Sequence, residues 1–133
     1  MAVTINGTTG IDFGTAGLTV PSIALTGAIT VTRETRIAMG ASAIDLSLGN
    51  YFTKTISGTT TLTVSNVPSA GTSGSFILDL TNGGSATVNW WSGMKWAGGT
   101  APTLTAAGRD VLGFFTHDGG TTWNGLVLGL DVK

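Results

Sequence analysis

Threonine and glycine dominate this chain and constrain its fold more than any other feature. The 133 residues include 24 threonines and 21 glycines. Threonine is β-branched and suits the half-buried surface of a strand, whereas glycine weakens helices and permits tight turns. Helical periodicity is scarce, because the best candidate, residues 32–39, is short and rich in threonine. The sequence therefore predicts an all-β protein.

Short runs in which apolar and polar residues alternate occupy the chain from residue 43 onward. Residues 44–48 and 76–80 are clear examples, and turn signals such as Gly49-Asn50 end the runs. The clearest hairpin covers residues 110–130, where HDGG joins two apolar segments. Seven or eight short strands at this spacing are typical of a sandwich or barrel. We therefore expect a single antiparallel β-sandwich or barrel-like module over residues 33–133.

Residues 1–32 differ from the rest, because their apolar residues come in short pulses at 18–20, 23–25 and 29–31. Strands this short cannot build an independent sheet. We expect an extended N-terminal arm that pairs with another chain or lies along a neighbouring protein. The densest charge cluster follows the arm, and such a cluster usually faces solvent, although a carboxylate flanked by arginines could also set a subunit register. These oligomer-interface candidates are Arg33, Glu34 and Arg36.

Charge is sparse elsewhere: six Lys and Arg and seven Asp and Glu make up 10% of the chain, with a net charge of -1. Binding to nucleic acid requires a cluster of basic side chains, so it is not expected. A charge-poor chain that is 41% hydrophobic favours a surface hidden against other copies of itself. We therefore expect a homo-oligomer.

Metal, cofactor and membrane functions also lack sequence support. The chain has no cysteine and one histidine, and its aspartates are isolated, so no zinc or calcium spacing occurs and no cofactor is expected. The N-terminus lacks the pattern of a signal peptide. No run of 18 apolar residues occurs, so no membrane insertion is expected.

Catalytic constellations are equally scarce. His117 and Asp118 are adjacent in the predicted hairpin turn, where aspartate is explained by local hydrogen bonds. Glu34 is the only glutamate, the aspartates are scattered along separate strands, and no Gly-x-Ser-x-Gly motif occurs. We therefore do not expect an enzyme.

Three of the four tryptophans lie within NWWSGMKWAGG, residues 89–99. Trp90 and Trp91 are neighbours and would point to opposite faces of a strand, so one should enter the core and the other should face solvent, a subunit or a ligand. A core or interface role is preferred to a sugar-stacking platform, because buried aromatic rings dominate both kinds of packing. The candidates for an interface or a glycan contact are Trp91, Trp96, Tyr51 and His117. The expected core residues are Phe76, Leu78, Leu80, Trp90, Leu112, Phe114, Trp123, Leu126 and Leu128.

Two parts of the chain resemble bacteriophage proteins. The opening MAVTINGTTGI resembles the start of many tail-fibre proteins, and residues 44–133 are similar to a β-rich module of phage virion proteins. The matching positions of that module are residues 88–91, 95–102, 110–112 and 118–123. The resemblance implies a structural protein of the virion, assembled in the host bacterial cytoplasm.

Such proteins are usually trimeric fibres, spikes or surface decorations. We therefore expect a small homotrimeric tail-fibre or spike component that docks by its arm to a tail or baseplate protein and displays the β module outward, where it could recognise a host surface glycan. The alternative is a capsid decoration protein, with the arm on the major capsid protein; the small size of the chain favours this reading. A carbohydrate-binding module is the third reading, and the charge-poor surface and the arm argue against it.

Overall fold

The computed structural model describes residues 35–133. The chain divides into two units, Met1–Val31 and Thr32–Lys133. The predicted arm over residues 1–32 lies outside the described residues, as do Arg33 and Glu34. Within the described part nearly all regular structure is strand, and the helical elements are two 3-10 turns of three residues. The all-β prediction is therefore confirmed.

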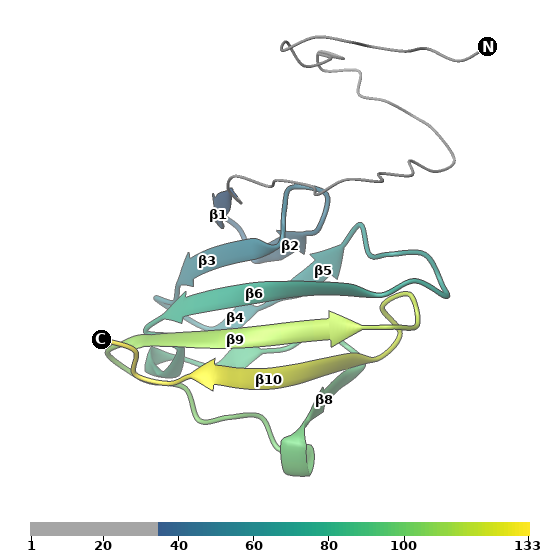
Figure 1. Cartoon of the computed structure of the whole chain (residues 1–133). Helices are drawn as coiled ribbons and strands as arrows, with labels where there is room; N and C mark the ends of the chain where they lie inside the picture. Colours follow the sequence, from purple (N-terminus) through teal and green to yellow (C-terminus); the bar gives the residue numbers. More distant parts are fainter. Residues whose placement is uncertain (1–34) are drawn as a thin grey trace, which may run out of the picture. The chain divides into compact units, whose positions relative to one another are not determined.

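A six-stranded mixed sheet, here called the main sheet, forms the larger layer of the module (Figure 1). Its strands are, in spatial order, β1 (Arg36–Ala38), β3 (Tyr51–Thr55), β6 (Gly74–Thr81), β9 (Arg109–Thr116), β10 (Trp123–Gly129) and β8 (Met94–Trp96). The remaining strands form two parallel two-stranded sheets, here called the ribbons. They pair β2 (Ala43–Asp45) with β5 (Thr63–Ser65), and β4 (Thr60–Thr61) with β7 (Val88–Asn89).

Most strand pairs are parallel, so the prediction of an antiparallel module is wrong except at β6, β9 and β10. Neighbouring parallel strands need a crossover between them. Here the chain alternates between the main sheet and the ribbons: β2 separates β1 from β3, and β4 and β5 separate β3 from β6. The segment Leu62–Thr63, at the junction of β4 and β5, links the two ribbons. The amide of Leu62 donates to the carbonyl oxygen of Asn89 on β7, and the amide of Thr63 donates to the carbonyl oxygen of Ser42, just before β2.

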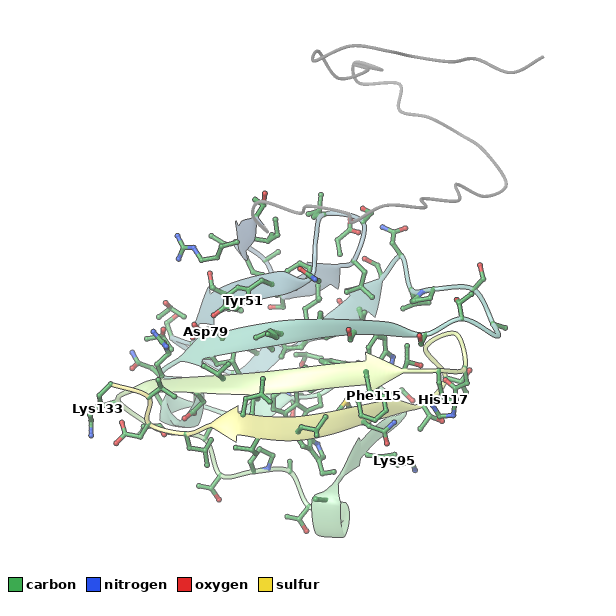
Figure 2. All side chains as sticks on the ribbon, viewed as in Figure 1. Tyr51, Asp79, Lys95, Phe115, His117 and Lys133 are labelled. Carbon is green, nitrogen blue, oxygen red and sulfur yellow. The ribbon has the colours of Figure 1, made fainter. Side chains whose placement is uncertain are left out.

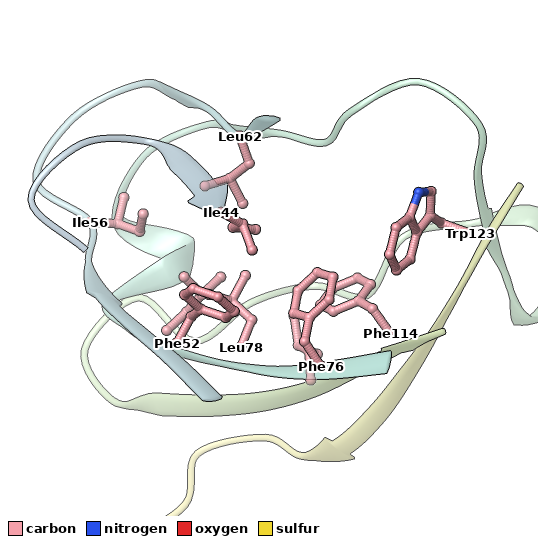
Figure 3. Close-up of a cluster of buried hydrophobic side chains, with 10 residues drawn as sticks. Ile44, Phe52, Ile56, Leu62, Phe76, Leu78, Phe114 and Trp123 are labelled. Carbon is pink, nitrogen blue, oxygen red and sulfur yellow. The ribbon is translucent and has the colours of Figure 1, made fainter. Parts of the chain in front are cut away.

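The hydrophobic core lies between the main sheet and the ribbons. Figure 3 shows Ile44 and Leu62 from the ribbon side facing Phe52 and Leu78 on the main sheet. Full burial of each such side chain contributes roughly 1.5–3 kcal/mol. Ten buried apolar residues form this core: Ile44, Phe52, Ile56, Leu62, Phe76, Leu78, Leu80, Leu112, Phe114 and Trp123. Six of them were expected from the sequence, namely Phe76, Leu78, Leu80, Leu112, Phe114 and Trp123.

Leu126 and Leu128 were also expected in the core, and that prediction is wrong, because they are 47% and 56% exposed. Successive side chains of a strand point to opposite faces. Trp123 points into the core, so Leu126 faces outward, and Leu128, at the bulge between Val127 and Gly129, lies over Gly113 on the same outer face. Gly125 occupies the inward position that follows Trp123, and there the ring of Trp96 fills the space that a larger side chain would need. Trp90, the remaining expected core residue, is half-buried and packs against the core.

Candidate functional site

The outer face of the main sheet, opposite the core, gathers the groups that are available for binding. On β6 and β9 the core-facing residues are buried, and the residues between them point outward. The register places Ile77 opposite Gly113 and Asp79 opposite Val111. On the next strand, Tyr51 lies opposite Ile77. This face has a polar half and an apolar half.

The polar half is a groove of about 570 Å³, here called the polar groove. It crosses β1, β3 and β6 and reaches the start of β9. Two guanidinium groups, one ammonium group, one carboxylate and several hydroxyls line it. The lining residues are Arg36, Ala38, Met39, Gly40, Thr53, Lys54, Thr55, Ser57, Asp79, Thr81 and Arg109.

Asp79 is the central polar group of this half, and it is 8% exposed. The hydroxyl of Tyr51 donates to Oδ2 of Asp79 over 3.1 Å, and Nε of Arg109 lies 3.5 Å from the same oxygen. Burial raises the pKa of Tyr51, and the hydrogen bond to Asp79 and its negative charge raise it further. Tyr51 therefore stays a neutral donor, and its hydroxyl is committed to Asp79 (Figure 2).

The apolar half, here called the apolar face, consists of Ile77, Val111, Phe115, Leu126 and Leu128. Phe115, Leu126 and Leu128 are 42%, 47% and 56% exposed. Gly113 lies between Ile77 and Leu126 in the register, and the side chain of Leu128 packs over it. A hollow of about 330 Å³ lies in this half, lined by Asn50, Ser75, Phe76, Ile77, Gly113, Phe114, Phe115 and Leu126.

The tryptophans belong to one aromatic cluster. Trp91 lies 5.0 Å from Phe114 and 5.9 Å from Trp123 between ring centroids, and Trp90 lies 5.1 Å from Trp96. The expectation that Trp90 and Trp91 point to opposite faces is wrong, because β7 ends at Asn89 and the strand alternation ends with it. Both rings pack against the core, and Nε1 of Trp91 is buried without a hydrogen-bond partner among the described residues.

The four candidate glycan contacts do not form one platform. Tyr51 lies on the outer face, and Trp91 lies in the aromatic cluster. Trp96 lines a separate hollow of about 350 Å³ with Pro102 and Val127. His117 is exposed in the turn between β9 and β10, well away from Tyr51 (Figure 2). Of the three charged interface candidates, the structure describes Arg36, which is exposed on β1 and lines the polar groove.

Asp118 organises the turn between β9 and β10. Its Oδ1 accepts hydrogen bonds from the amide of Thr122 over 2.9 Å and from the hydroxyl of Thr116 over 2.9 Å. The hydrogen bonds from Thr122 are the main cause that lowers the pKa of Asp118 to about 2. The hydroxyl of Thr116 also accepts from the amide of Gly120. The turn structure therefore accounts for an aspartate at this position.

Replacement of Asp118 with asparagine is expected to lower stability in a pH-dependent way. A carboxyl whose pKa is lowered by folding stabilises the protein above its unfolded pKa, about 3.9, and this contribution is lost as the pH falls through about 2. The free energies of unfolding of the wild type and the variant should therefore diverge between pH 2 and pH 4 and stay apart above it. Urea unfolding across this range measures both. A difference that is independent of pH would contradict the assignment.

Between residues 35 and 133, no group of three or more His, Asp or Glu side chains is placed to hold a metal ion. In the same part of the chain, no helix is both long and apolar enough to cross a bilayer.

Comparison with protein-family models, with curated proteins and with solved structures found no match. The function is therefore argued from two observations: the geometry of the outer face and the resemblance of the sequence to phage virion proteins.

Sequence reasoning missed several residues of the outer face. Asp79 and Arg109 become neighbours only because β6 pairs with β9, and they are 30 positions apart in the chain. Phe115 could have been found, since it follows Phe114 on the same strand and must point to the opposite face.

Proposed function

We propose that this chain is a structural protein of a bacteriophage virion, a small homotrimeric fibre or spike component that acts by assembly and not by catalysis. The observation that carries the proposal is the apolar face, in which three large apolar side chains of adjacent strands are 42–56% exposed. Exposed apolar patches on this scale mark contact surfaces. The resemblance of residues 44–133 to a phage virion module supports the virion as the place of that contact.

The composition supports an assembling role as well. Thirteen charged side chains in 133 residues give little protection from association, so a surface covered by other subunits suits this chain. The arm expected over residues 1–32 would make the attachment to another virion protein, a tail or baseplate protein in this proposal. The polar groove offers the hydroxyl and guanidinium groups that a host glycan would contact.

The copy number of the chain in purified particles tests this proposal. Quantitative mass spectrometry of virions should find the chain, at a small multiple of three copies per particle if it is a fibre or spike component. Copy numbers close to that of the major capsid protein would instead assign it to the capsid surface as a decoration protein. Its absence from particles would overturn the virion assignment.

A further inference from the structure

We propose that the apolar face is the surface by which one copy of this chain binds another. The inference rests on the proposed function, because a homo-oligomeric virion protein needs a surface for self-association. Beyond the proposed function, we assign the contact to one surface of the module and name the residues at its centre.

The shape of the apolar face suits a second copy. Phe115 and Leu126 project from it, Leu128 lies over Gly113, and a hollow of about 330 Å³ is recessed between Ile77, Phe115 and Leu126. A face that carries both projections and a recess can receive its own side chains from another copy. In the proposed homotrimer the contact is head-to-tail around a three-fold axis, so the projections of one copy would meet the recess of the next.

The charge distribution also suits a second copy. None of the five residues of the apolar face carries a charge, so packing two copies together buries no ion there. The neighbouring charges of Asp79 and Arg109 already pair with each other at 3.5 Å on the same sheet. A glycan, by contrast, needs hydrogen-bonding groups, and on this face they are confined to Asn50 and Ser75 at the edge of the hollow.

The size of the face fits the centre of an interface. The whole outer face of β6, β9 and β10, including the polar positions Asp79, Thr81 and Arg109, covers about 380 Å² at a strand spacing of about 4.8 Å, and the apolar face is the larger part of it. An interface of standard size buries about 800 Å² per partner, with an apolar centre and a polar rim. The polar groove adjoins the apolar face across β6 and would supply part of that rim.

Two neighbouring residues of β10 provide a matched test. Leu126 and Val127 are each 47% exposed, but Leu126 pairs with Gly113 on the apolar face, whereas Val127 pairs with the buried Leu112. Full-length wild type is expected to give a mass of three times 13.4 kDa by light scattering, as the proposed homotrimer requires. Leu126→Asp should raise the dissociation constant at least about 30-fold, while Val127→Asp should leave it unchanged.

Far-UV circular dichroism checks folding, because Trp96 lines a hollow with Leu126 and its fluorescence could respond to the substitution directly. A wild type that stays monomeric at all concentrations would overturn the inference, as would an oligomer that Leu126→Asp leaves intact. Failure of the proposed function would look different: a chain that self-associates through this face but is absent from virions.

A cysteine crosslink gives a second test that does not depend on a destabilising substitution. The chain contains no cysteine, so any disulfide-linked species must come from the introduced residue. Phe115→Cys, on the apolar face, is expected to form a covalent dimer under mild oxidation. The control Leu48→Cys lies in a loop, is 59% exposed and should stay monomeric on a denaturing gel. Equal crosslinking of the two variants would contradict the assignment.

Discussion

Replacing Trp123 with alanine is expected to lower the free energy of unfolding by about 3–5 kcal/mol. Trp123 is 1% exposed, and its ring centroid lies 5.4 Å from that of Phe76 and 5.9 Å from that of Trp91. Truncation removes the buried aromatic area and leaves a cavity between the main sheet and the segment around Trp91. Because a domain of this size is stabilised by about 5–15 kcal/mol, the loss is a large fraction of the total.

Urea unfolding followed by circular dichroism measures this loss. Leu48→Ala provides the control, since that leucine is 59% exposed and its truncation should change stability by less than about 0.5 kcal/mol. Similar losses in the two variants would show that the aromatic cluster is not the centre of the core.

The strand content could be predicted from the sequence, but the pairing of the strands could not. Turn signals such as Gly49-Asn50 correctly indicate where a strand begins or ends, since β3 starts at Tyr51. They do not show whether the next strand returns beside the previous one or crosses to another layer. The pairing of β9 with β10 was the exception, because a connection as short as the HDGG turn allows only an antiparallel pair.

The apolar face could have been predicted from the sequence, because the alternation of side chains along β10 places its leucines outward. Placing Trp123 in the core requires Leu126 and Leu128 to face outward, and a prediction that puts all three in the core contradicts the period of a strand. The polar groove could not have been predicted from the sequence. Asp79 and Arg109 are ordinary outward positions until the pairing of β6 with β9 brings them together.

The second large loss of stability is expected on replacing Asp110. This fully buried carboxylate hydrogen-bonds two other segments of the chain at the start of β9. Its Oδ2 accepts from the amide of Thr105 over 2.6 Å, and its Oδ1 accepts from the hydroxyl of Thr105 over 2.7 Å and from the amide of Asp131 over 3.0 Å. The backbone of Asp131 has a φ of 50°, a left-handed conformation that favours glycine, so it depends on such a contact.

Asp110→Ala is therefore expected to lower the free energy of unfolding by about 3 kcal/mol, because two backbone amides lose their acceptor in a partly buried setting. Asp45→Ala is the matched control. Asp45 also accepts three hydrogen bonds, from the amide and hydroxyl of Ser47 and from the side chain of Asn66, but water can replace them because the carboxylate is exposed. Urea unfolding at pH 7 should show a clearly larger loss for Asp110→Ala. Equal losses would mean that burial adds nothing to the hydrogen bonds of Asp110, and that the segments at Thr105 and Asp131 hold their places without it.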